Sequence, residues 1–215
     1  MSKQPFVRRI FTIGHSTHTL DNFLAILQSQ AVDCVVDVRS VAASKFNPQF
    51  NKHELSFFLK CNDIVYIHMP KEFGARHNSP ALLDEEGKVD FRKVVQTGEF
   101  LSGIARLETG IAKGFTIALM CSESEPFDCH RFSMVSYALE ARGIKVDHIL
   151  KNKSIISNTK LEHRLITKYE KWLPTPSIFD PDISPEQVLA QAYRLRNKDV
   201  AYSPYINVTK QEEAS

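Results

Sequence analysis

The chain has 215 residues, of which 43% are hydrophobic and 24% charged, and its 27 basic and 25 acidic residues give a net charge of +2. This composition excludes a fibrous or wholly disordered chain. The near-neutral charge does not indicate a bulk nucleic-acid binder or a membrane-surface protein. No apolar run approaches the ~18 residues of a membrane helix, and four cysteines are too few for a disulfide scaffold. We therefore expect a soluble, cytoplasmic protein with reduced thiols.

Short apolar runs alternate with helix-like stretches over the first 150 residues. In chain order, the pattern predicts a strand at 6–13, a helix at 20–30 capped by Thr19, a strand at 32–38, a helix at 51–61 and a strand at 64–68. A polar loop at 69–88 follows, then one or two helices at 91–112, a strand at 115–120, a helix at 130–141 and a strand at 145–149. This alternation predicts an α/β fold with a doubly wound, mainly parallel sheet in a Rossmann-like three-layer arrangement.

The remaining residues have a different character and carry the small positive excess. Residues 151–159 are polar, 161–172 can form a helix, and prolines at 174, 176, 181 and 185 interrupt the chain. Ser184, followed by Pro185 and Gln187, predicts a helix start, and this helix should run to about residue 197. We predict an α/β domain at 1–150 and a helical, proline-interrupted extension at 151–215. The extension either packs on the sheet domain or forms an arm that contacts a substrate or partner.

Polar side chains gather where the predicted strands end. Because ligands of open parallel sheets bind at the carboxyl ends of the strands, we expect these side chains to converge there. The first strand is followed by His15 and Ser16, the second ends at Asp37 and Arg39, the fourth is followed by Cys121 and Glu123, and the next helix begins near Cys129, His130 and Arg131.

Each of these features also has a structural interpretation. Residues 14–16 are typical of a tight turn. Asp37 and Arg39 could form an ion pair that fixes a loop, or act as a base and an anion clamp. Cys34 and Cys61 lie in apolar stretches, and we expect both to be buried and inert.

Cys121 and Cys129 allow three chemistries, besides simple packing of a strand-terminal cysteine. In the first, one of them is a thiolate nucleophile that His130 or His15 activates. In the second, the two cysteines, Glu123 and a histidine bind zinc, although the spacing lacks the tight Cys-x-x-Cys arrangement. In the third, the cysteines form a reversible disulfide, for which the spacing is again atypical.

Four motifs resemble the domain-of-unknown-function 488 family of α/β proteins. They are Thr12-Ile13-Gly14-His15-Ser16, Val36-Asp37-Val38-Arg39, Asn47-Pro48-Gln49-Phe50 and the most specific one, Cys121-x-Glu123-x-x-Pro126-x-x-Cys129-His130-Arg131. They occur in the family's order and span about residues 10–150. The resemblance implies the fold and a shared site, and it implies no particular reaction.

We expect an enzyme that acts by hydrolysis or group transfer on a small molecule bearing phosphate or carboxylate, with a nucleotide as the first choice. In this hypothesis Cys121 is the nucleophile or an orienting thiol, His15 or His130 the general base, Glu123 or Asp37 the orienting or acidic partner, and Ser16, Arg39 and Arg131 bind the anion.

Two other classes stay open. One is a non-catalytic module that senses a nucleotide or a nucleic-acid end, with Arg194, Arg196 and Lys198 supplying phosphate contacts. The other is a protein with structural zinc held by Cys121, Cys129 and His130. No cofactor besides zinc is indicated.

Overall fold

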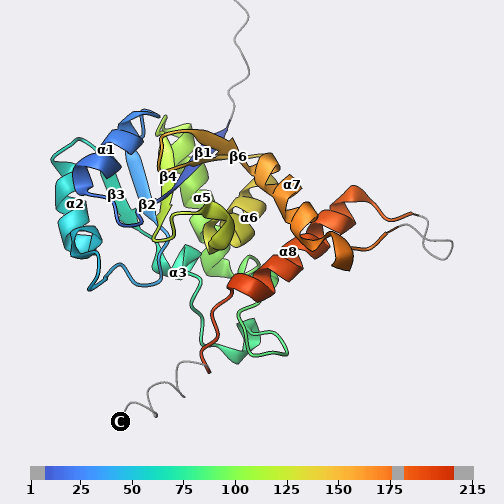
Figure 1. Cartoon of the computed structure of the whole chain (residues 1–215). Helices are drawn as coiled ribbons and strands as arrows, with labels where there is room; N and C mark the ends of the chain where they lie inside the picture. Colours follow the sequence, from blue (N-terminus) through green and yellow to red (C-terminus); the bar gives the residue numbers. More distant parts are fainter. Residues whose placement is uncertain (1–7, 176–181, 206–215) are drawn as a thin grey trace, which may run out of the picture.

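The computed structural model describes residues 8–175 and 182–205, and a six-stranded sheet of order β3-β2-β4-β1-β5-β6 forms its centre (Figure 1). The strands are β1 (Arg9–Gly14), β2 (Cys34–Asp37), β3 (Val65–His68), β4 (Ile117–Cys121), β5 (Lys145–Ile149) and β6 (Ile155–Ser157). Strands β1 to β5 run parallel, and β6 pairs antiparallel with β5. The predicted α/β fold with a mainly parallel sheet is therefore confirmed.

Helices cover both faces of the sheet. They are α1 (Leu20–Gln28), α2 (Lys52–Lys60), α3 (Pro70–Phe73), α4 (Phe91–Val94), α5 (Gly98–Ala112), α6 (Tyr137–Glu140), α7 (Asn158–Tyr169) and α8 (Pro185–Val200). Helices α1 and α2 lie on one side of the sheet and α5 and α6 on the other (Figure 1). No described helix is long and apolar enough to cross a membrane.

The two helices on the first face follow their sequence patterns closely. Thr19 caps α1, since its hydroxyl accepts a hydrogen bond from the Asn22 backbone N–H at 3.2 Å. Helix α2 buries Leu55 and Leu59, which lie one turn apart and so share a face. Our expectation that Cys61 is buried is wrong, because this residue is exposed. It follows the last turn of α2, beyond the buried stripe.

Three local features differ from the predicted pattern. The predicted loop at 69–88 contains the short helix α3, and the polar stretch at 151–159 contains β6. The predicted helix at 130–141 begins with a π-helical segment, Arg131–Ser136, which α6 continues. The predicted strand residues 6 and 7 and the prolines at 176 and 181 lie outside the described residues.

The C-terminal segment packs against the sheet domain. Ser184 and Gln187 form the predicted capping box of α8, and this helix continues to Val200. Helices α7 and α8 share a separate apolar core with Phe127 and Phe132, which belong to the segment between β4 and α6. The boundary that we predict near residue 150 stays a prediction. Because α8 contacts the segment that carries the last family motif, the position of this segment depends partly on the C-terminal helices.

Candidate functional site

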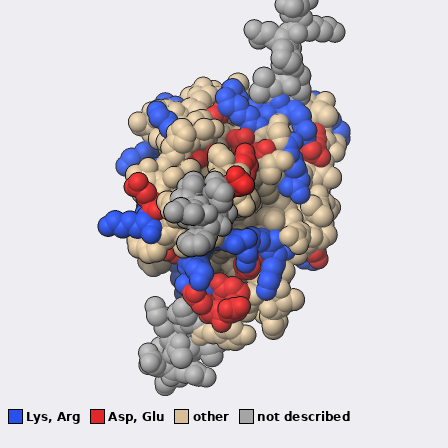
Figure 2. Space-filling view, turned by 90° about the vertical axis from the view of Figure 1, so that its right-hand side faces the viewer, with Lys and Arg blue, Asp and Glu red and all other residues tan. Residues whose placement is uncertain are grey.

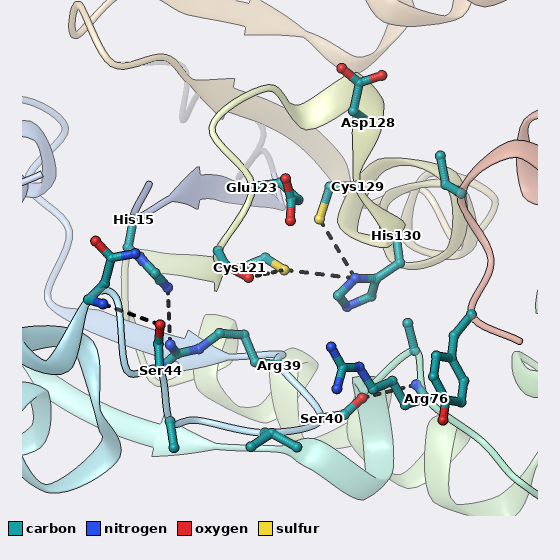
Figure 3. Close-up of a pocket in the computed structure, with 17 residues that line it drawn as sticks. His15, Arg39, Ser40, Ser44, Arg76, Cys121, Glu123, Asp128, Cys129 and His130 are labelled. Atoms are coloured by element: carbon teal, nitrogen blue, oxygen red, sulfur yellow. Dashed lines mark hydrogen bonds between the residues drawn. The ribbon is translucent and has the colours of Figure 1, made fainter. Parts of the chain in front are cut away.

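A cavity of about 510 Å³ opens at the carboxyl ends of β1, β2 and β4 (Figure 3). The chain leaves β1 and β2 toward the face covered by α1 and α2, whereas it leaves β4 toward the opposite face. Such divergence of neighbouring connections opens a crevice at the edge of a parallel sheet. Six of the predicted site residues line the cavity: His15, Arg39, Cys121, Glu123, Cys129 and His130. Ser16, Asp37 and Arg131 are not part of its wall.

The ends of β1 and β4 are held together closely. Gly14 pairs with Cys121, and the His15 backbone N–H donates to the Cys121 carbonyl at 2.9 Å. A Cβ atom on Gly14 would lie 1.8 Å from the backbone oxygen of Glu123. Glycine is therefore required here for the chain after β4 to cross the end of β1.

One part of the site is a set of polar side chains that satisfy one another, His15, Asp37, Arg39 and Tyr66, which we call the anchored cluster. Arg39 donates from Nε and Nη2 to the two carboxylate oxygens of Asp37, at 2.9 and 2.6 Å. Tyr66 adds a 2.6 Å hydrogen bond to the same carboxylate. Asp37 is fully buried. Its carboxylate thus supports Arg39, and it has no contact with the cavity through which it could act as a base.

His15 is also held in place. Its ring stacks on Phe50 with centroids 4.3 Å apart. Its Nδ1 donates to the Ser16 carbonyl at 2.9 Å, so Nε2 carries the lone pair and accepts from Arg39 at 3.0 Å. Burial lowers the pKa of His15 to about 4. The imidazole is therefore neutral near pH 7, and its basic nitrogen already has a partner.

Arg131 positions a loop. Its side chain is 1% exposed and donates to the backbone oxygens of Glu123 and Ser124 at 2.6 and 3.0 Å. The carboxylate of Glu123 itself is exposed and lines the cavity. Among the described residues, the Nε of Arg131 has no hydrogen-bond partner. The structure thus shows Arg131 as a support for the segment after β4, and Ser16 as a backbone acceptor at a positive φ of 46°.

The second part of the site is the cavity cluster, which we define as Cys121, Cys129 and His130. The His130 Nδ1 atom lies 3.8 Å from the Cys121 sulfur and 3.6 Å from the Cys129 sulfur (Figure 3). Its Nε2 donates to the Val38 carbonyl at 3.2 Å, which leaves the Nδ1 lone pair facing both thiols. Both cysteines are free and buried in the cavity wall.

The surroundings shift the pKa values of the two thiols in opposite directions. The neighbouring Cys129 thiol, together with His130 and Arg131, holds the pKa of Cys121 well below its usual range, against the opposing effect of burial. Burial and the adjacent Cys121 raise the pKa of Cys129 well above its usual range. The environment therefore favours the thiolate at Cys121 and the protonated thiol at Cys129. A thiolate is the form of sulfur that reacts as a nucleophile and binds metals.

Arg76 is a cavity residue that our sequence analysis did not select. Its backbone N–H donates to the Ser40 hydroxyl at 3.0 Å, and its guanidinium lies 5.6 Å from the ring centre of Tyr202. Gly74 allows this approach, since a Cβ there would lie 2.7 Å from the Ser40 hydroxyl oxygen. Arg76 is exposed and lines the cavity, and no carboxylate of the described residues pairs with it. Only its place in the loop after the third strand could have indicated it.

The basic residues of α8 are mostly paired. Arg196 is buried and binds Asp128 and the Phe127 carbonyl, and Lys198 pairs with Glu86. Arg194 lines a separate groove, away from the cavity. On the face shown in Figure 2, lysine and arginine side chains lie among acidic ones. Arg196 thus positions the segment before Cys129, and it does not line the cavity.

Fold and site together define a class: an α/β protein whose parallel sheet carries two cysteines and a histidine in a polar cavity. The family model described as Domain of unknown function DUF488 matches residues 19–138, more than half of the chain, and the chain belongs to this family. The match contains three of the four motifs, whereas residues 12–16 precede it. No curated protein matches the chain.

Proposed function

We propose that the chain is an enzyme that acts by hydrolysis or group transfer on an anionic small molecule, with Cys121 as its nucleophile and His130 as the general base. The observation that carries this proposal is the contact of the His130 Nδ1 with the Cys121 sulfur in the wall of the cavity. A nucleophile and a base within reach of each other, with the base oriented by a third group, form the arrangement of covalent catalysis. The Val38 carbonyl supplies that orientation.

In this reaction the Cys121 sulfur bonds to an electrophilic carbon or phosphorus atom of the ligand, and the bond to the leaving group breaks. The Nδ1 lone pair of His130 takes the thiol proton during the attack, and His130 then passes this proton to the leaving group. Water or a second hydroxyl acceptor then displaces the sulfur while His130 takes its proton, and this proton returns to the released Cys121 sulfur. Cys129 stays protonated and donates toward the Cys121 sulfur, as the opposite pKa shifts of the two thiols support.

The charge on one side of the cavity favours an anionic ligand. Arg76 presents a guanidinium without a carboxylate partner among the described residues, beside the aromatic ring of Tyr202. Guanidinium groups bind phosphate and carboxylate through paired hydrogen bonds, and aromatic rings stack on bases. A nucleotide meets both features. We therefore place Arg76 in the anion-binding role that the sequence suggested for Arg39 and Arg131.

Turnover of a panel of nucleotides and phosphate esters by reduced, chelator-treated protein tests the proposal. Cys121→Ala should lower turnover by on the order of a thousandfold or more while leaving ligand binding nearly unchanged. Cys34→Ala is the matched control, since Cys34 is buried on the neighbouring strand outside the cavity wall. Equal turnover in the two variants would overturn the nucleophile. Binding without turnover in the unchanged protein would favour a non-catalytic nucleotide-binding module.

Thiol reactivity gives an independent test. Iodoacetamide at neutral pH should modify Cys121 before Cys61, although Cys61 is exposed and Cys121 is buried in the cavity wall. The physical reason is that only the thiolate reacts, and the surroundings of Cys121 favour it. Modification of Cys61 alone, read by peptide mass spectrometry, would contradict the proposal.

A further inference from the structure

The cavity cluster also has the spacing of a metal site. Among the described residues, Cys121, Cys129 and His130 place their sulfur and nitrogen atoms within 4.8 Å of one another. Tetrahedral zinc, with Zn–S bonds of about 2.3 Å and Zn–N bonds of about 2.0 Å, requires S···N distances of about 3.5 Å. The two S···N distances here are 3.8 and 3.6 Å. The histidine nitrogen therefore lies within a few tenths of an ångström of the zinc-binding distance from each sulfur. The two sulfur atoms, which lie within 4.8 Å of each other, would have to be about 3.8 Å apart.

The histidine is already in the form that a metal needs. Its Nε2 hydrogen is directed at the Val38 carbonyl, so that Nδ1 presents its lone pair to the centre of the cluster. Metal-bound histidines typically donate their other ring N–H to a carbonyl or carboxylate, which fixes the ring's orientation. Two thiolates would also neutralise the charge of a divalent ion in this buried place.

We infer that Cys121, Cys129 and His130 form a three-ligand site for Zn²⁺, with the fourth coordination position directed into the cavity. Structural zinc sites take four protein ligands, whereas sites that bind water or a ligand keep one position open. All three ligands lie in the cavity wall, and the carboxylates of Glu123 and Asp128 line the same cavity outside the cluster. An anion or water would complete the coordination.

The consequence for reactivity rests on the proposed function. Zinc would bind the Cys121 sulfur through the electron pair that the nucleophile needs, and the Cys129 thiol would release its proton on binding. Metal-loaded protein would therefore be inactive in the cysteine-dependent reaction, and removal of the metal would activate it. Zinc thus becomes a regulator of the same site.

Anaerobic titration of the reduced, metal-free full chain with Co²⁺ tests the inference. We expect one equivalent to give a sulfur-to-cobalt charge-transfer band with the visible bands of tetrahedral cobalt, and Zn²⁺ to displace it. Cys129→Ala should weaken cobalt binding by more than about tenfold, whereas Cys61→Ala should leave it unchanged. His130→Asn provides a second variant if Cys129→Ala does not fold. Absence of the charge-transfer band in the unchanged chain, or an equal effect of Cys61→Ala, would overturn the site.

Alkylation in the same samples separates the two proposals. With zinc bound, iodoacetamide should modify Cys61 and spare Cys121, and a chelator should restore the reaction at Cys121. A selectively reactive Cys121 without cobalt binding would overturn the zinc site and leave the proposed function standing. Cobalt binding with a Cys121 that stays unreactive in metal-free protein would support the zinc site and contradict the nucleophile.

Discussion

The anchored cluster and the cavity cluster lie at the same edge of one sheet, yet they use their polar groups in opposite ways. In the anchored cluster, Asp37 and Arg39 satisfy each other, and Tyr66, His15 and the Phe50 carbonyl supply further hydrogen bonds. In the cavity cluster, the His130 lone pair faces two sulfur atoms with long and weak contacts. Saturated hydrogen bonds hold a structure in place, whereas unsaturated groups facing a cavity remain available for a ligand.

The two clusters therefore differ in what a substitution in them should change. We expect substitutions in the anchored cluster to cost mainly folding free energy, because they leave buried charges without partners. Substitutions facing the cavity should cost mainly function, because their groups have few partners to lose. Measurements of stability and binding on matched variants test this contrast.

Asp37→Ala should give the largest loss of stability. It leaves the Arg39 guanidinium, only 5% exposed, without its counter-charge, and removing one partner of a buried ion pair costs about 3–5 kcal/mol. Asp90→Ala is the matched control, because Asp90 also receives two hydrogen bonds from the arginine two residues later, Arg92. Arg92 is 56% exposed, so the control should lose only about 1 kcal/mol, chiefly the helix cap. Urea unfolding measures both, and equal losses would contradict the contrast.

Acid should weaken the anchored cluster through His15. Its pKa is about 4 in the folded chain, below the value of 6.5 for a free histidine, so the unfolded chain binds more protons between these pH values. Stability from this residue is complete above pH 6.5 and falls by about 3 kcal/mol as the pH drops to 4. His15→Asn should reduce the pH dependence of the unfolding free energy in this range, and the part that remains should come from buried His148, whose pKa is lowered to about 3. His53→Asn, at an exposed position of α2, should leave it unchanged.

The sequence predicts those elements of the fold that have a local pattern of apolar residues. Short segments rich in apolar residues predict β1 to β5, and the clearest of them is the uninterrupted run Ile117–Cys121, because β4 is buried on both faces of the parallel sheet. Strand β6 has three residues in a polar stretch, and only its pairing with β5 makes it a strand. The π-helical start of the segment at Arg131–Ser136 likewise has no local signal in the sequence.

For the site, the sequence predicted the edge of the sheet at which the polar residues meet, and it left the role of each residue open. The motifs brought His15, Cys121 and His130 to one edge, since parallel strands end together. The roles depend on partners distant in the chain, such as the Phe50 carbonyl for Arg39. Periodicity carries no information about such partners. The contacts that distinguish support from chemistry were therefore visible only in three dimensions.

Tyr66→Phe should have a smaller effect than the loss of Asp37. It removes one hydrogen bond of 2.6 Å to the carboxylate, while the contacts from Arg39 remain, and such a bond to a charged group contributes about 1.5 kcal/mol. Tyr202→Phe is the control, since its hydroxyl has no hydrogen bond to the described part of the chain. A loss below about 0.5 kcal/mol in both variants would show that Arg39 alone holds the carboxylate.

Arg76→Gln should change stability least, within about 0.5 kcal/mol, because its exposed guanidinium has no carboxylate partner among the described residues. Its effect should appear in binding. Loss of charge-assisted hydrogen bonds should weaken the affinity for inorganic phosphate by about tenfold or more, measured by calorimetry on the full chain. Lys45→Gln removes an equal charge from an exposed position outside the cavity wall. If both variants bind phosphate equally well, Arg76 does not hold the anion.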